Sequence, residues 1–266
     1  MLVVYLLIIR TRWGQELDER ALFGRELISD LRSVQADRFL RIVSGGTIGI
    51  AAILVAAVAF LRGRPRLALI AAGSIGVAVL ITEVLKLVLL TRPDFVSTFL
   101  DNGINTYPSG HTTVGMSVCI AAMLVVPPRL RIPTALAAGA IGAAFGVAVV
   151  AAGWHRPSDA IGSYLVCLAV GAAAAIVVRR LPDPPDAAPG PESGASRAQA
   201  RLGGTELGLI ALGMALLAVF GAAALAARGI PFFSAGAGFL VASGTLVLAS
   251  FACAGLLAAA MTGHSS

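Results

Sequence analysis

Charge is scarce in this 266-residue chain, and lysine and histidine are its rarest charge-bearing residues. Charged residues make up 13% of the sequence, whereas hydrophobic residues make up 58%. Because a soluble domain carries about 25% charged residues, this composition excludes a soluble globular protein. Lys86 is the one lysine, and the histidines are His111, His155 and His264. Ionisable side chains used so sparingly inside an apolar chain are expected to serve chemistry.

Cysteine is also rare, and all three cysteines lie in apolar segments, at Cys119, Cys167 and Cys253. Cysteines in such surroundings behave as small hydrophobic residues, so neither a disulfide nor a metal site is predicted. We expect no metal and no other cofactor, because no acidic cluster has ligand spacing. The net charge of +6 does not indicate a nucleic-acid partner, because the arginines flank apolar segments as topology signals do. Many arginines beside one lysine are typical of a GC-rich bacterial genome.

Seven apolar segments approach the length of about 20 residues that a membrane-spanning helix needs. Lipid cannot hydrogen-bond to free backbone groups, so these segments are expected to be helices. The sequence therefore predicts an all-α, polytopic membrane helix bundle. A shorter apolar block, residues 2–9, cannot span by itself. The seven segments are residues 43–61, 67–90, 111–126, 132–152, 160–178, 207–227 and 236–261.

Two stretches divide the chain outside these segments. Residues 10–41 are charged, with apolar positions at loosely helical spacing. They fit an amphipathic helix on a membrane surface or, equally well, a solvated helix with paired charges. Residues 181–204 are rich in Pro, Ala, Gly and Ser, which predicts a flexible linker. We therefore expect a first unit at 1–180 and a C-terminal transmembrane hairpin at 205–266, which carries no recognisable motif.

Arginine-rich loops predict the orientation of the bundle. If consecutive spans alternate, three such loops share one side, which the positive-inside rule makes cytoplasmic. The loops after residues 90 and 152 then face outward together, although the arginines of residues 10–41 would lie outside too. We expect a multi-pass cell-membrane protein whose site lies on the extracytoplasmic face. The arginines concerned are Arg62, Arg64, Arg66, Arg129, Arg131, Arg179, Arg180, Arg197 and Arg201.

The short motif Pro-Ser-Gly-His lies at residues 108–111, where an apolar segment begins. Ser109 is expected to be a helix N-cap, since a serine hydroxyl there accepts a hydrogen bond from a free backbone N–H. The free N–H groups and the positive dipole end of such a helix predict an anion site. Gly110 lets a ligand approach the backbone closely, and His111 would lie beside that ligand.

His155 and Asp159 form a second polar group, four residues apart. A carboxylate bonded to one ring nitrogen fixes the tautomer and leaves the other nitrogen as a nucleophile or base. Because Pro157 fits only the first turn of a helix, we expect His155 just before a helix and Asp159 just inside it. A capped helix start with a solvated histidine explains the pair equally well.

Lys86 lies near the end of an apolar segment, three residues after Glu83 and shortly before Arg92. Arg92 precedes a proline and is therefore expected to be extended. An ion pair with Glu83, or a lysine that reaches toward the membrane surface, is one interpretation of Lys86. The other is a cation directed, together with Arg92 and Ser109, at a common anion.

In this order, the residues resemble the type 2 phosphatidic acid phosphatase family, the membrane branch of a superfamily that includes bacterial acid phosphatases and vanadium haloperoxidases. Its motifs are Lys-x6-Arg-Pro, Pro-Ser-Gly-His and Ser-Arg-x5-His-x3-Asp. The second motif matches fully at residues 108–111, and half of the third matches at His155 and Asp159. The first matches with one residue fewer, as Lys86-x5-Arg92-Pro93.

The resemblance covers about residues 1–180 and implies a six-helix phosphatase core, with residues 2–9 as the first span. It fails at Ala148 and Val149, where the family has Ser-Arg. Valine cannot replace a guanidinium that holds phosphate oxygens by a two-pronged contact. By analogy with a lost oxyanion donor, the cost is roughly 10²–10³ in rate. The neighbouring Arg156 is a candidate substitute.

The resemblance also implies a role for each site residue and a metal-independent reaction. His155 attacks phosphorus and forms a phosphohistidine, while Asp159 orients the imidazole ring. His111 protonates the leaving oxygen and then activates water. The phosphoryl oxygens are held by Lys86, Arg92, Ser109 and the backbone N–H of Gly110.

A site at helix ends suits a substrate whose tail stays in lipid while its head reaches water. We therefore expect a membrane hydrolase that acts on a lipid phosphate or polyprenyl diphosphate, with the lipid and water as its partners. A catalytically weak or inactive lipid-phosphate-binding protein is the alternative, favoured by Val149 and the shortened first motif. A transporter is less supported, because the charged residues gather at one face rather than mid-membrane. The spans exclude a soluble haloperoxidase.

Overall fold

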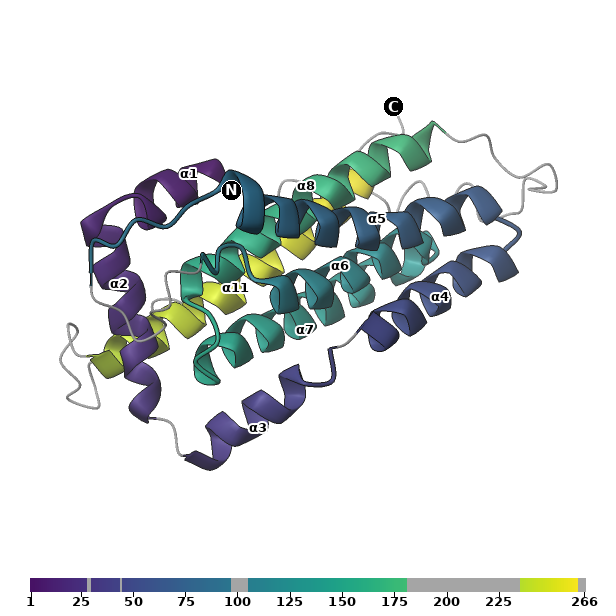
Figure 1. Cartoon of the computed structure of the whole chain (residues 1–266). Coiled ribbons are helices and arrows are strands. Elements are labelled where there is room, and N and C mark those ends of the chain that lie inside the picture. The colour runs from purple at the N-terminus through teal and green to yellow at the C-terminus, as the bar shows by residue number, and fades with distance from the viewer. Residues whose placement is uncertain (28–29, 44, 97–104, 181–234, 263–266) are drawn as a thin grey trace.

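The computed structural model describes residues 1–27, 30–43, 45–96, 105–180 and 235–262 (Figure 1). Within these residues the secondary structure is helical and contains no strand. Four helices are long and apolar enough to cross a membrane, at Pro65–Leu89, Pro128–Ala151, Pro157–Arg179 and Ala237–Met261. The predicted all-α membrane helix bundle is therefore confirmed.

Six of the seven predicted apolar segments form helices with nearly the expected bounds. Two of them, α4 and α6, are shorter than the four candidate spans. The remaining segment, 207–227, lies outside the described residues. The helices are α4 (Gly45–Leu61), α5 (Pro65–Val84) with the π-helical turn η3 (Leu85–Leu89), α6 (Gly110–Val125), the 3₁₀ turn η4 (Pro128–Leu130) with α7 (Arg131–Ala151), α8 (Pro157–Arg179) and α11 (Ala235–Thr262).

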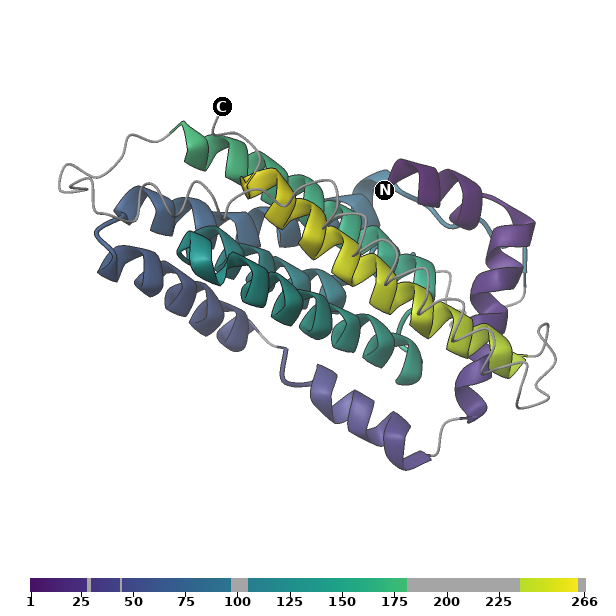
Figure 2. The ribbon, with the colours of Figure 1, turned by 180° about the vertical axis from the view of Figure 1, so that it is seen from behind.

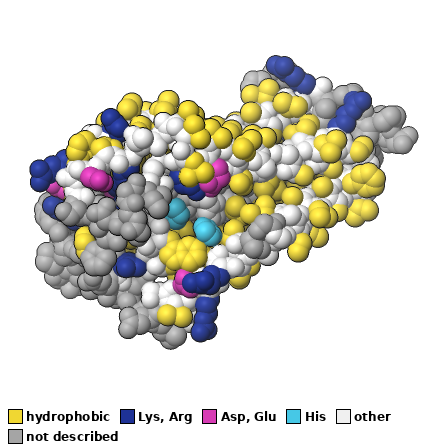
Figure 3. Space-filling view, viewed as in Figure 1, with side chains coloured by type: hydrophobic (Ala, Val, Ile, Leu, Met, Phe, Trp, Pro, Cys, Tyr) yellow, Lys and Arg dark blue, Asp and Glu magenta, His cyan; other side chains and the backbone are white. Residues whose placement is uncertain are grey.

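Helix α6 lies at the centre of the bundle, in contact with α4, α5, α7 and α8. Its side chains Met116, Ile120 and Met123 are fully buried, together with Ile75 of α5. The outer surface is apolar as well, with Leu69, Leu80, Ile53 and Leu54 among its exposed side chains. Figure 3 shows apolar side chains spread along the bundle surface, as expected of a surface that faces lipid.

Helix α11 packs along α7 and α8 on the back of the bundle (Figure 2). The Ser250 hydroxyl donates to the carbonyl of Gly139 at 2.9 Å, and Arg131 Nη1 donates to the carbonyl of Met261 at 3.0 Å. Gly139 permits this approach, since a Cβ there would lie 2.5 Å from the Phe251 ring. The predicted linker 181–204 and much of the segment 205–266 lie outside the described residues, so these domain bounds stay a prediction.

The N-terminal residues form short helices at one end of the bundle: α1 (Leu2–Val4), η1 (Tyr5–Ile9), α2 (Arg12–Phe23), η2 (Gly24–Leu27) and α3 (Asp30–Leu40). The block Leu2–Ile9 is shorter than every candidate span. Helix α2 packs against α11. Its polar residues Gln15, Asp18 and Glu19 are buried. This helix is therefore neither a purely solvated helix nor a purely amphipathic helix on a membrane surface.

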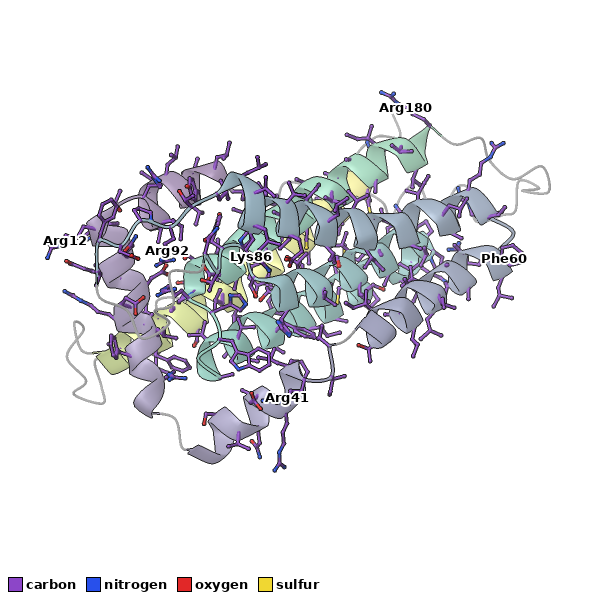
Figure 4. The ribbon with its side chains drawn as sticks, viewed as in Figure 1. Arg12, Arg41, Phe60, Lys86, Arg92 and Arg180 are labelled. Atoms are coloured by element: carbon purple, nitrogen blue, oxygen red, sulfur yellow. The ribbon has the colours of Figure 1, made fainter. Side chains whose placement is uncertain are left out.

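Arginines mark the opposite end of the bundle. In Figure 4, Phe60 and Arg180 lie at one end and Lys86 and Arg92 at the other. Burial, followed by repulsion from Arg64 and Arg129, lowers the pKa of Arg62, so the loops after α4 and α6 are neighbours. Residues 10–41 share the end that holds Lys86, as the labelled Arg12 and Arg41 show.

Candidate active site

The Pro-Ser-Gly-His motif begins α6 as the sequence predicts. Ser109 is the N-cap, and its hydroxyl accepts a hydrogen bond from the Thr112 backbone N–H at 3.4 Å. The Ser109 backbone N–H donates to the Asp159 carbonyl at 3.1 Å, and the Ser163 hydroxyl donates to the Ser109 carbonyl at 2.7 Å. These bonds fix the start of α6 against the first turns of α8, so the two motifs meet in space.

His155 and Asp159 are arranged at the start of α8 as expected. Helix α8 begins at Pro157 with Arg156 as its N-cap. His155 Nδ1 lies 3.2 Å from Asp159 Oδ2, which also accepts hydrogen bonds from the Arg156 backbone N–H at 3.1 Å and the Thr106 hydroxyl at 2.8 Å. The carboxylate thus binds one ring nitrogen of His155, and Nε2 is the nitrogen left for chemistry.

His111 and Lys86 lie beside this pair. The His111 ring contacts the Trp154 ring edge-on, with centroids 4.9 Å apart, and interacts electrostatically with His155 and Lys86. Lys86 lies in the π-helical turn η3, and such turns are frequent at functional sites. Figure 3 shows histidine side chains next to one another, close to basic and acidic side chains.

The Lys86 ammonium forms the ion pair that was one of its two predicted interpretations. Its Nζ lies 2.6 Å from Glu83 Oε1. A Cβ built on Gly110 would lie 3.3 Å from that carboxylate oxygen and 3.8 Å from Nζ. The ion pair therefore borders the N-terminus of α6, and the other interpretation, a cation directed at an anion, stays a prediction.

Arg92 lies in the extended segment after η3, and 7% of its side chain is exposed. Its Nη2 donates to Asp18 Oδ2 at 3.4 Å, and Nη1 lies 3.9 Å from Asp159 Oδ1. Among the described residues, Nε and Nη1 of Arg92 have no hydrogen-bond acceptor. Buried guanidinium N–H groups normally have hydrogen-bond partners, so these two nitrogens of Arg92 can still donate to an acceptor.

Val149 stands where the resembled family has an arginine, and Arg156 is the candidate substitute for it. The Val149 side chain is completely buried in the apolar core, while its carbonyl accepts a hydrogen bond from the His155 backbone N–H at 3.1 Å. The Arg156 side chain is buried too, and its Nε donates to Glu19 Oε1. Its Nη1 donates to the Thr106 hydroxyl at 3.5 Å. Arg156 is thus held behind Asp159, so its predicted phosphate contact stays a prediction.

Asp18 and Glu19 of α2 are site residues that sequence reasoning missed. Burial, followed by repulsion from Asp159, raises the pKa of Asp18 to about 6 against the opposing effect of Arg92. No local pattern identifies these acids, because they lie in a stretch with many other charges and far from the motifs. Only the packing of α2 against the site reveals their contacts.

The residues brought together suit phosphoryl transfer. They include two imidazoles, cationic side chains and a helix N-terminus, which together can hold an anion and move protons. Within the described part of the chain, no group of three or more His, Cys, Asp or Glu side chains could hold a metal ion.

Residues 67–183 match the family model of the PAP2 superfamily. This part of the chain is similar to the PAP2 superfamily. The PAP2 segment, as we call residues 67–183, contains all the predicted site residues and agrees with the resemblance to type 2 phosphatidic acid phosphatases. This similarity supports a phosphatase-type function. No curated protein and no solved structure matches the chain.

The PAP2 segment leaves out two parts of the structure that touch it. Helix α2 begins and ends before residue 67, yet it places Asp18 and Glu19 in the site. Helix α11 begins after residue 183 and packs against α7 and α8. Both elements therefore lie outside the residues that the family model matches.

Proposed function

We propose that this protein is a membrane phosphatase that hydrolyses a lipid monophosphate or diphosphate through a phosphohistidine at His155. The observation that carries the proposal is the buried Arg92: within the described residues its Nε and Nη1 have no hydrogen-bond acceptor, and Nη1 lies 3.9 Å from Asp159 Oδ1, next to the His155–Asp159 pair. Phosphate oxygens are good acceptors for a guanidinium. An anion bound there would lie within reach of the nucleophile.

The reaction has two steps. In the first, His155 Nε2 attacks phosphorus, the bond to the leaving oxygen breaks, and His111 gives its proton to that oxygen. Asp159 stabilises the imidazolium that forms. In the second, neutral His111 takes a proton from water as the water oxygen attacks phosphorus. The phosphorus–nitrogen bond breaks, inorganic phosphate leaves, and both histidines return to their starting states.

Positive charge does most of the remaining work. Phosphoryl transfer needs chiefly positioning and charge stabilisation, which Lys86, Arg92 and the backbone N–H of Gly110 supply. Ser109, as the N-cap, fixes the direction of those backbone groups. Without the arginine that Val149 replaces, we expect a rate lower by roughly 10²–10³ than a complete site would give.

A lipid substrate fits the surroundings of Lys86. The next residues, Leu87, Val88 and Leu89, expose between 64% and 73% of their surface. An acyl or prenyl chain lying on these residues would place its phosphate beside Lys86. The site lies at the end of the bundle opposite Arg180 (Figure 4). With the positive-inside rule, the arginines of the loops at the Arg180 end support a site on the extracytoplasmic face of the cell membrane, although Arg12 and Arg41 lie at the end that holds the site.

Purified protein in detergent, given a panel of lipid monophosphates and diphosphates, tests the proposal. We expect phosphate release that resists a metal chelator and that His155→Ala abolishes. Lys86→Ala and Arg92→Ala should lower kcat/KM by at least tenfold. Release that persists in His155→Ala contradicts the proposal.

The same panel separates the second candidate, a catalytically silent lipid-phosphate-binding protein. Val149 and the shortened first motif favour it. Tight binding of a lipid phosphate with no turnover would support the binder. A chelator-sensitive activity would contradict the metal-independent reaction.

A further inference from the structure

Two carboxylates from α2 contact the polar residues around His155. Asp18 Oδ1 accepts a hydrogen bond from the Ser158 backbone N–H at 3.1 Å, and Asp18 Oδ2 accepts one from Arg92 Nη2 at 3.4 Å. Glu19 Oε1 accepts one from Arg156 Nε. Asp18 and Glu19 expose 5% and 3% of their surface. These are buried ion pairs, in contrast to surface pairs, which contribute little.

The Glu19 contact continues through buried atoms to the candidate nucleophile. Arg156 Nη1 donates to the Thr106 hydroxyl at 3.5 Å, and this hydroxyl donates to Asp159 Oδ2 at 2.8 Å. Asp159 Oδ2 lies 3.2 Å from His155 Nδ1. A shift of Glu19 would therefore reach the His155 ring through Arg156, Thr106 and Asp159 in turn.

The Asp18 contact leaves the anion-binding capacity of Arg92 intact. Asp18 uses Nη2, while Nε and Nη1 have no acceptor among the described residues. A carboxylate that blocked the site would take up the free donors instead. Since Asp18 also binds the first turn of α8 through Ser158, it joins Arg92 to the helix that carries Asp159.

We propose that Asp18 and Glu19 are positioning residues of the phosphatase. Asp18 holds the Arg92 guanidinium in the position that binds phosphate, and Glu19 holds Arg156 behind the Asp159–His155 pair. The inference rests on the function proposed above. It assigns a role to α2, which lies outside the PAP2 segment. With Val149 in place of an arginine, the site depends on the exact placement of its remaining guanidinium groups.

Asp18→Asn and Glu19→Gln test this inference in the full-length protein, with Glu16→Gln as the matched control. Glu16 lies on the same helix and, among the described residues, pairs with the exposed Arg12 at 3.1 Å. Asp18→Asn should lower kcat/KM by tenfold or more, mainly through KM, because Arg92 binds phosphate. Glu19→Gln should act mainly on kcat, because it reaches His155. Glu16→Gln should match the wild type.

The pH profile separates positioning from mere support of the fold. Asp18 is faced by Arg92, Ser158, Asp159 and Tyr107, and its pKa of about 6 predicts that wild-type kcat/KM falls as Asp18 becomes protonated. Asp18→Asn should lack this acidic limb. An Asp18→Asn variant that loses activity while keeping the wild-type profile and KM has only lost folded protein, and that result overturns the inference.

Other outcomes are equally decisive. Wild-type or higher activity in both Asp18→Asn and Glu19→Gln overturns the inference. Higher activity would indicate that the two carboxylates block the site. If His155→Ala is inactive while both α2 variants match the wild type, the positioning role fails and the proposed function stands. If the wild-type protein hydrolyses no lipid phosphate, both proposals fall together.

Discussion

Val149 shows how a single residue can lose one role and keep another. Its side chain lies in the apolar core. In the family that the sequence resembles, an arginine at this position supplies a phosphate contact. Its backbone carbonyl still holds the His155 backbone N–H at 3.1 Å and the Trp154 backbone N–H at 2.9 Å. The turn that presents His155 is thus maintained by the backbone, whereas in the proposed mechanism the positive charge comes from Arg92 and Lys86.

Asp18 makes a prediction about stability as a function of pH. Its pKa rises from 3.8 to about 6 on folding, chiefly through burial. Between these pH values the folded protein binds more protons than the unfolded chain, so Asp18 stabilises most at low pH and this stability is lost as the pH rises through about 6. The melting temperature of the wild type minus that of Asp18→Asn should therefore fall between about pH 4 and pH 7.

Comparing these two proteins cancels the titrating groups that they share and that do not interact with Asp18. A melting-temperature difference that stays constant or increases with pH would show that folding does not raise the pKa of the Asp18 carboxyl. The expected result would mean that the charged form of Asp18 costs stability at neutral pH. Such a cost is typical of groups kept for function.

Among the structural elements, the sequence predicted best the helices that are long and apolar, such as α5 and α8, because lipid forces apolar segments into helices. The start of α6 at Ser109 and of α8 near Pro157 could be predicted as well, since capping is local chemistry. The place of α2 could not. Its buried acids depend on partners more than 70 residues away, and no periodicity encodes such contacts.

Helix α11 gives a prediction about packing between elements. Gly139 of α7 lies against Phe251 of α11, and a Cβ there would come within 2.5 Å of the ring. Gly139→Ala should therefore lower the free energy of unfolding by about 1–3 kcal/mol. Gly73→Ala is the matched control, because a Cβ at Gly73 meets nothing within 4 Å. Melting of the detergent-solubilised protein measures both.

Equal stability of the two alanine variants would contradict the close contact of α7 with α11. A loss confined to Gly139→Ala would show that α11 is part of the folded bundle. From the sequence alone, the Pro, Ala, Gly and Ser residues between 181 and 204 predicted a linker followed by a hairpin. This composition contains no information about where the following helix packs.

At the scale of the whole molecule, two ends with different chemistry define the protein. One end carries the loop arginines, and the other brings together motifs separated by tens of residues in the sequence (Figure 4). The sequence predicted this separation because spans of similar length alternate in direction. The distances within the site could not be predicted, since they depend on how α5, α6 and α8 pack.

The central claim is that His155 carries the phosphoryl group during turnover. The most direct measurement uses a lipid phosphate with radioactive phosphorus, mixed with the protein and quenched within one turnover under alkaline conditions, which preserve phosphohistidine. The account predicts label on the peptide that contains His155, and none in His155→Ala. Steady turnover with no labelled protein, or label on any other residue, would contradict it.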